Sequence, residues 1–417
     1  MANFMLVPLA IKYLGQESYG IWLTLSSVIT WFALFDIGLG NGLRNKFAEA
    51  RALGEDYDAQ AFVSTAYFSI GAISTVLMIT IISLNSFVNW SWVFNTSSDI
   101  NNELSLLFPV VFGFFGLQLV SKLIVSIFQA DQYHSIPYKV QFFGQVLSLM
   151  VIWLLTKSNG HSLLLFGSLY AALPVLVLLA LNLFAFNGRY RAYRPVFSMC
   201  KKKYLSEITG LGFKFFIIQI AAMVLFSTDN FIITQLFGPA EVVPYNVAFK
   251  YFSIVTMGYT ILTTPYWSSF TEAYAKQDFN WIRASVARIQ KIWFLVPVAL
   301  TFMVLFSNWF YRMWVGETVK VPIKLSIVMA IFVAMLTFNM VYTNFINGVG
   351  KIRLQLITGI VSMVLNIPLS VFFAGTLHWG ATGVIAATCV CICTGVVLRP
   401  IQYRMIINNK HRGIWGA

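Results

Sequence analysis

The stretch AFVSTAYFSIGAISTVLMITIISL, residues 61–84, decides the class of this chain, because it carries no charged residue over a length that can cross a bilayer. A helix needs roughly 20 apolar residues to span a hydrocarbon core of about 30 Å. Outward from this stretch, similar runs recur along the whole chain. They predict an all-α polytopic membrane protein with about 12 transmembrane helices, at residues 1–14, 19–42, 61–84, 104–128, 140–156, 162–186, 211–237, 244–270, 292–311, 323–346, 354–374 and 381–398.

The Lys and Arg residues are concentrated in alternate connections, which predicts the orientation. Basic residues accumulate on the cytoplasmic side because their translocation is disfavoured. One set of loops and the C-terminal tail carry Arg44, Lys46, Arg51, Lys139, Arg189, Arg191, Arg194, Lys201, Lys202, Lys203, Lys276, Arg283, Arg288, Lys291, Lys351, Arg353, Arg399, Arg404, Lys410 and Arg412. The opposite loops carry only Lys12, Lys157, Arg312, Lys320 and Lys324. We therefore expect both termini to be cytoplasmic.

The net charge of +13 would suggest nucleic-acid binding in a soluble protein. In a chain that is 58% hydrophobic, the charge records topology and an attraction to anionic lipid headgroups, so we predict membrane lipids and no nucleic acid as partners. Cys389, Cys391 and Cys393 lie two residues apart on a predicted helix, which scatters their side chains around its axis. With Cys200 in a loop, they support neither a disulfide framework nor a metal site, and we predict no cofactor.

An internal repeat divides the chain into two halves. Shifting the sequence by 223 residues places Gly15 on Gly238 and Phe47 on Phe270, each pair identical. Six spans then fall in each half, so both halves have the same orientation and are related by a pseudo-two-fold axis along the membrane normal. The predicted domains are an N-terminal six-helix bundle at 1–186, a basic cytoplasmic linker at 187–210, a C-terminal six-helix bundle at 211–398 and a cytoplasmic tail at 399–417.

The first predicted span is short. Its 14 residues reach only about 21 Å as a helix, less than the hydrocarbon thickness. In the repeat register Met1 falls on Val224, whereas the matching span begins near Leu211. We therefore expect the first helix to be truncated, or its start codon to be assigned too late.

Motifs near the N-terminus carry a resemblance to a known family. The pair LG at 14–15, YGIW at 19–22 and FDIGLGNGLRNK at 35–46 resemble the first helical pair of bacterial O-antigen flippases, which belong to the multidrug/oligosaccharidyl-lipid/polysaccharide (MOP) exporter superfamily. The similarity in motif covers about the first 50 residues, and the six-plus-six layout extends it to the whole chain. The short first helix departs from the family pattern.

The resemblance implies a MATE/MOP-like fold and a function. Such a protein translocates an undecaprenyl-diphosphate-linked oligosaccharide from the cytoplasmic to the periplasmic leaflet of the bacterial inner membrane, by alternating access around a central cavity. Other polysaccharide-assembly proteins are expected partners. No P-loop pattern occurs, so we expect coupling to an H+ or Na+ gradient rather than to ATP hydrolysis.

A diphosphate and a sugar cannot cross hydrocarbon uncompensated, so the path needs cations and polar side chains. Three lysines within spans, Lys122, Lys214 and Lys250, are candidates for phosphate contact. Lys122 and Lys214 could also snorkel to the interface. Uncharged polar residues within spans are candidates for sugar contact, or for bonds between helices: Gln118, Gln145, Gln219, Thr228, Asn230, Asn339, Thr343, Asn344 and Asn347.

Lys250 and Asp229 lie at similar depths on adjacent predicted helices, so an ion pair between them is plausible. Three alternatives stay open: a cavity or gate role, a static pair between the helices, or no contact. Asp36, near the cytoplasmic end of its span, could cap that helix or pair with Arg44, Lys46 or Lys214. Asp36, Asp229 and Arg44 are therefore the candidates for a gate or coupling site.

Two other classes of membrane protein would need residues that this sequence lacks. A MATE-like multidrug or cation antiporter would hold buried carboxylates for a cationic cargo, yet the spans contain only Asp36 and Asp229 against three lysines. A membrane polysaccharide polymerase or acyltransferase would need a catalytic constellation. Every histidine falls in a predicted loop or the tail, and no paired carboxylates appear, so we predict a transporter and not an enzyme.

Overall fold

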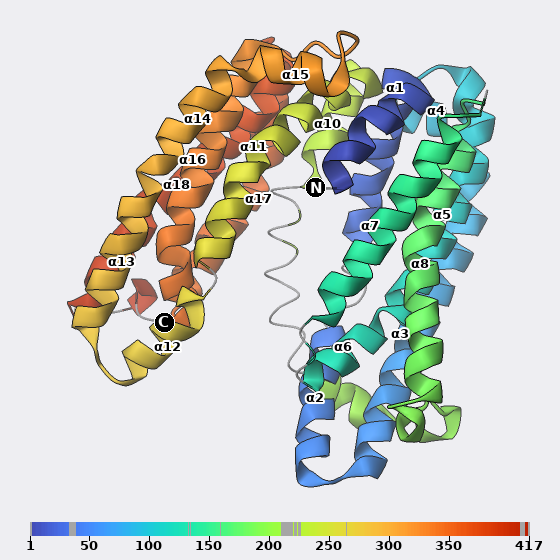
Figure 1. Ribbon diagram of the computed structural model, residues 1–417, viewed down its shortest axis with the longest axis vertical. Helices are drawn as coiled ribbons and strands as arrows, with labels where there is room; N and C mark the ends of the chain where they lie inside the picture. Colours follow the sequence, from blue (N-terminus) through green and yellow to red (C-terminus); the bar gives the residue numbers. More distant parts are fainter. Residues whose placement is uncertain are drawn as a thin grey trace. The chain divides into compact units, whose positions relative to one another are not determined.

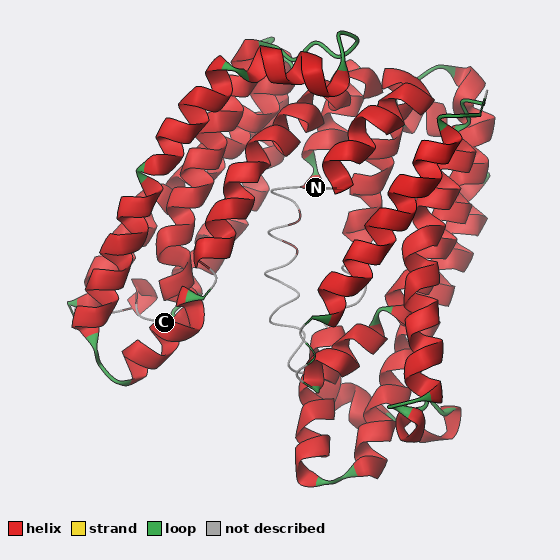
Figure 2. Cartoon of the chain, in the orientation of Figure 1, coloured by secondary structure: helices red, strands yellow, loops and turns green. Residues whose placement is uncertain are grey.

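The computed structural model describes residues 2–32, 39–131, 133, 135–158, 160–209, 220, 223, 227–263, 265–408 and 413–415. These residues form helices and loops, without a strand among them (Figure 2). They divide into unit 1, Met1–Ile220, and unit 2, Ala221–Ala417.

Unit 1 is a bundle of long helices joined by short turns (Figure 1). Helices α3, α5, α7 and α8 are its long apolar helices. Helix α5 continues into α6 through a break at Lys122. The helices are α1 (Ala2–Phe32), α2 (Leu39–Leu53), α3 (Asp56–Asn85), α4 (Trp90–Val93), α5 (Asn101–Ser121), α6 (Leu123–Ala130), α7 (Ile136–Leu155) and α8 (Leu163–Asn187), with short turns η2 (Ser98–Ile100), η3 (Arg191–Tyr193) and η4 (Phe197–Met199).

Unit 2 is also a bundle of helices joined by short turns. Its longest helices, α16 and α18, pack against each other, and α11 and α17 pack against one or the other of them. The helices are α10 (Asp229–Phe237), α11 (Val242–Thr263), α12 (Tyr266–Ala275), α13 (Phe279–Trp293), α14 (Leu295–Leu305), α15 (Ser307–Val315), α16 (Ile323–Gly348), α17 (Arg353–Val371) and α18 (Ala381–Ile407), with short turns η5 (Pro239–Glu241) and η7 (Gly413–Trp415) and the π-helical turn η6 (Phe372–Thr376).

The predicted fold class is confirmed. Among the described residues, eight helices are long and apolar enough to cross a membrane: Asp56–Asn85, Ser98–Ala130, Ile136–Leu155, Leu163–Asn187, Phe279–Leu305, Ile323–Gly348, Arg353–Thr376 and Ala381–Ile407. Each matches one predicted span. The other four predicted spans correspond to the two arms of α1, to the region of α10, and to α11 with α12. They include residues 33–38, most of 210–226 and residue 264, which lie outside the described residues.

The two glycines paired by the internal repeat have nearly the same backbone conformation. Gly15 has φ 77° and ψ 174°, and Gly238 has φ 88° and ψ 162°, a region that is almost exclusive to glycine. Each glycine separates two helical segments at a corner. Phe47 and Phe270, the other aligned pair, are both fully buried. The repeat therefore extends from sequence identity to the geometry of equivalent corners.

The basic linker predicted at 187–210 is folded against unit 1. Tyr190, Tyr193 and Tyr204 are buried in one hydrophobic cluster with Phe47 and residues of α2, α3, α6 and α8. Phe47 contacts the rings of Tyr190 and Tyr193 edge to face. This segment is consequently part of the unit 1 core as well as the connection that follows α8.

Candidate functional site

The predicted charged residues have different environments. Asp36 and Lys214 lie outside the described residues. Arg44 is half-buried on α2, and Lys122 is exposed at the junction of α5 and α6. Lys250 is half-buried on α11. Their roles in a cavity stay predictions.

Asp229 is the most deeply buried charged residue of this set, with 6% of its surface exposed. Its Oδ2 accepts a hydrogen bond from the Tyr245 hydroxyl on α11. Its Oδ1 is buried and has no hydrogen-bond partner within the described part of the chain. Asp229 therefore has one satisfied oxygen and one that a proton, a cation or water would satisfy.

Of the three alternatives for Asp229 and Lys250, the geometry agrees with no contact between them, since the recorded partner of Asp229 is Tyr245. Matching depth is not sufficient for contact on a helix. Lys250 lies five residues beyond Tyr245, which turns its side chain by about 140° around α11. The side of α11 that faces Asp229 is thus the side that carries Tyr245.

In the described segment 227–237, α10 begins at Asp229, and the preceding Thr228 has helical backbone angles, φ −85° and ψ −20°. Most of residues 211–226 lie outside the described residues, so the continuity of the span predicted for 211–237 stays a prediction.

Further polar side chains lie between the helices of unit 2. Asn246 donates to Asn230 at 2.8 Å, linking α11 to α10. Asn366 on α17 donates to Thr388 on α18 at 3.1 Å, and its Oδ1 is buried without a partner in the described chain. The Oγ of Ser370, one turn along α17, is also buried without a hydrogen-bond partner in the described chain. Unit 2 thus has a polar interior with unused oxygen atoms.

Sequence reasoning missed Arg399, because it placed this residue in the cytoplasmic tail. Helix α18 instead continues through Pro400 to Ile407, so Arg399 lies inside it. The guanidinium donates from Nη1 to the Thr343 hydroxyl on α16 at 2.8 Å. Its Nε is buried and has no hydrogen-bond partner among the described residues. The available signal was the apolar pattern of Ile401, Ile406 and Ile407, which extends the helix beyond the proline.

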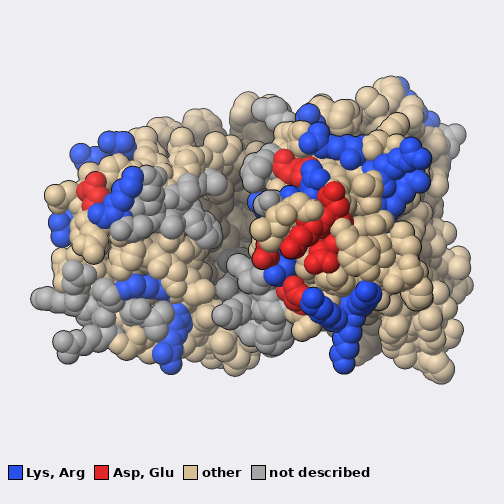
Figure 3. Space-filling model, turned by 90° about the horizontal axis from the view of Figure 1, so that it is seen from below, with Lys and Arg blue, Asp and Glu red and all other residues tan. Residues whose placement is uncertain are grey.

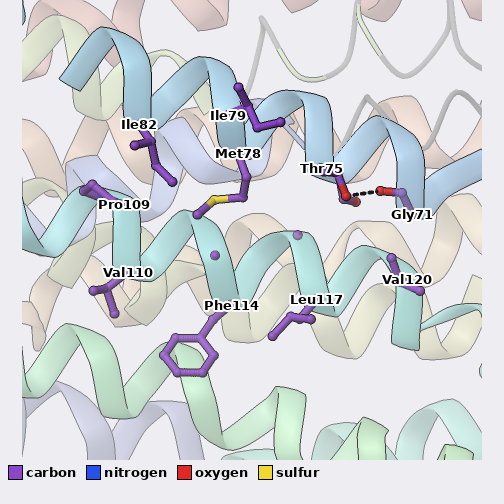
Figure 4. A pocket seen from close by; sticks show the side chains of 13 residues that line it. Gly71, Thr75, Met78, Ile79, Ile82, Pro109, Val110, Phe114, Leu117 and Val120 are labelled. Carbon is purple, nitrogen blue, oxygen red and sulfur yellow. Dashed lines mark hydrogen bonds between the residues drawn. The ribbon is translucent and has the colours of Figure 1, made fainter.

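A large groove on unit 1 lies between α3 and α5 and has a volume of about 760 Å³ (Figure 4). Its walls are apolar or small residues such as Met78, Ile82 and Gly113, without a charged side chain. The hydroxyl of Thr75 is already bonded to the carbonyl of Gly71 at 2.8 Å. This groove can accommodate a hydrocarbon chain, and its lining residues include no cation that would bind a phosphate.

One end of unit 1 gathers charged residues of both signs (Figure 3). Asp131 lies 3.9 Å from the Arg51 guanidinium and 3.6 Å from that of Arg189. Tyr190 donates to Asp131 at 3.0 Å, and Tyr204 donates to Asp58 at 2.7 Å. Partly exposed ion pairs contribute little individually, about 0–1 kcal/mol. Together with the buried tyrosine rings, these bonds hold residues 187–209 on the unit 1 bundle.

Comparisons with known proteins agree with this architecture. The MatE family model matches residues 215–372. A multidrug-resistance MATE transporter of the MOP superfamily, solved in an inward-facing conformation, superposes with a TM-score of 0.81 at 16% identity, covering 98% of this chain and 94% of that one. Its outward-facing structure superposes with a TM-score of 0.64 at 15% identity, covering 99% and 93%.

The chain has the fold of these MATE transporters of the MOP superfamily. A Yersinia pseudotuberculosis protein with the provisional name O-antigen export protein is 22% identical over 90% of this chain and 84% of its own length. A Salmonella typhi protein, provisionally named an O-antigen transporter, is 24% identical over 66% of this chain and 62% of its own length. The predicted resemblance to MOP-superfamily flippases is confirmed.

Proposed function

We propose that this protein is a flippase for an undecaprenyl-diphosphate-linked oligosaccharide, either an O-antigen repeat unit or a related surface-polysaccharide unit. It moves this lipid from the cytoplasmic to the periplasmic leaflet of a bacterial inner membrane by alternating access of its two helical bundles. The observation that carries the proposal is the match, over 90% of the chain, to a protein named for O-antigen export. The MATE structures share the fold, but their low identity gives no support to a drug substrate.

The polar interior of unit 2 supports this proposal. A glycosyl diphosphate needs cations for its phosphates and amides or hydroxyls for its sugars. Unit 2 offers Arg399 as a half-buried cation and Asn339 and Asn366 as buried amides with unused oxygens. Lys122, Lys214 and Lys250 stay candidates for further phosphate contacts.

The direct test is complementation of a strain that lacks its own surface-polysaccharide flippase. Restored surface polysaccharide supports the proposal. No restoration by a chain that is present in the membrane, together with export of cationic dyes by the same cells, would instead support a drug antiporter. A panel of strains that assemble different repeat units would identify the sugars that are accepted.

Transport is coupled to a proton or sodium gradient in this proposal, and Asp229 is the coupling residue. A buried carboxylate with one unused oxygen can gain and lose a proton, or bind a cation, as the protein changes conformation. The variant D229N keeps an oxygen that can accept from Tyr245, so we expect it to fold. It should flip lipid downhill in vesicles but lose the acceleration by an imposed gradient. Unchanged acceleration in D229N would exclude Asp229 and leave Asp36 as the candidate.

A further inference from the structure

We propose that Arg399, Thr343 and Asn339 form a subsite for a glycosyl phosphate, in which the arginine binds phosphate and the asparagine accepts from a sugar hydroxyl. We call it the Arg399 subsite. This inference rests on the proposed function for the identity of its ligand, a lipid-linked glycosyl diphosphate. The chemistry of the subsite follows from unit 2 alone.

Arg399 has a hydrogen-bond donor without an acceptor in the described chain. A guanidinium has five N–H donors. Arg399 spends one on Thr343, whose hydroxyl in turn donates to the Asn339 carbonyl at 2.7 Å. The Nε of Arg399 is buried and has no acceptor within the described chain. A buried donor without an acceptor is costly, so an acceptor from outside the chain is favoured.

The charge of Arg399 is not balanced by any ion pair recorded in the described chain. The ion pairs recorded among the described residues all lie in unit 1, so none of them neutralises Arg399. A half-buried cation is unfavourable without a counter-charge. Phosphate supplies the charge together with two oxygens in the planar arrangement that a guanidinium recognises.

The Oδ1 of Asn339 is buried and receives no hydrogen bond from the described residues, while its Nδ2 donates to the Ile392 carbonyl at 3.3 Å. Asn339 therefore needs a donor where Arg399 needs an acceptor. A phosphate alone supplies the acceptor for Arg399, and a sugar hydroxyl alone supplies the donor for Asn339. A glycosyl phosphate carries both groups a few bonds apart.

Gly395 fixes the distance between these two groups. A Cβ built on Gly395 would lie 2.7 Å from Asn339 Oδ1 and 3.3 Å from Arg399 Nε. The two atoms are consequently at most about 6 Å apart, and a ligand that contacts both must displace side chains that now cover them. The missing side chain at 395 leaves the space in which the guanidinium lies against α18. The subsite thus depends on glycine at this position.

The test measures binding of short polyprenyl probes to the purified full chain in detergent. The probes are farnesyl diphosphate, farnesyl diphosphate carrying one hexose, inorganic pyrophosphate and farnesol. We expect R399Q to weaken binding of both farnesyl diphosphates about tenfold or more, because a charge-assisted bond is lost. We expect N339L to weaken only the hexose-bearing probe. Farnesol, which lacks phosphate, should respond to neither variant.

Arg404 provides the matched control, because it is an exposed arginine on the same helix. R404Q should bind all probes like the wild type. Equal binding of farnesyl diphosphate by R399Q and wild type would overturn the subsite. A loss shared by R399Q and R404Q would overturn it as well, since it would reflect net charge. Inorganic pyrophosphate identifies whether phosphate is bound without a lipid tail.

Stability separates a binding role from a structural one. Arg399 lacks a counter-charge, so R399Q should melt at or above the wild-type temperature while binding less. A lower melting temperature together with weaker binding of farnesol would mean that the arginine only supports the fold. If the wild type fails to complement but its binding of farnesyl diphosphate depends on Arg399, the flippase proposal is rejected and the subsite proposal stands. Complementation by R399Q at wild-type level would reject the subsite and keep the flippase.

Discussion

The hydrogen bond between Tyr245 and Asp229 gives the sharpest stability prediction. The variant Y245F removes the hydroxyl and leaves both oxygens of a buried carboxyl without a donor from the described chain. A hydrogen bond to a charged group contributes about 1.5–3 kcal/mol, and the ring itself is retained. We therefore expect unit 2 to lose about 2 kcal/mol, which for a domain of this size lowers the melting temperature by about 4–8 °C.

The assay is thermal unfolding of the purified protein followed by tryptophan fluorescence, with Y259F as the matched control. Tyr259 is also buried on α11, but its hydroxyl donates to the Ile289 carbonyl over a long 3.4 Å. Y259F should therefore cost less than about 1 kcal/mol. Equal melting temperatures for Y245F and wild type would refute the argument that the carboxyl depends on this donor. A loss in Y259F as large as in Y245F would show that any buried hydroxyl matters equally.

Three further predictions follow from local geometry. A Cβ on Gly383 would lie 2.5 Å from the Ala374 backbone nitrogen, so G383A should cost about 1–3 kcal/mol by overpacking, measured as a lower melting temperature. Gly238 has φ +88°, so G238A should destabilise by about 1–3 kcal/mol in the same assay. The hydrogen bond to Asp58, with burial, raises the pKa of Tyr204 to about 12. The wild type should therefore lose stability between pH 10 and pH 12 as this proton leaves, whereas Y204F should be less stable below pH 10 and should lack that loss.

The transmembrane helices could be predicted from sequence because the determining property is local. A hydrocarbon core imposes length and hydropathy on each crossing separately, without reference to other helices. Gly15 and Gly238 were also recognisable, since a corner with positive φ requires glycine in both halves of a repeat. These features need no knowledge of tertiary contacts.

The site residues were less predictable because their roles depend on rotation and on helix ends. Lys250 has a depth similar to that of Asp229 but lies on a different side of α11 from Tyr245, which hydropathy does not reveal. Arg399 directly follows the span predicted at 381–398, so the sequence places it in the tail. In the structure α18 continues through Pro400, and packing of Ile406 and Ile407 into unit 2 stabilises that extension.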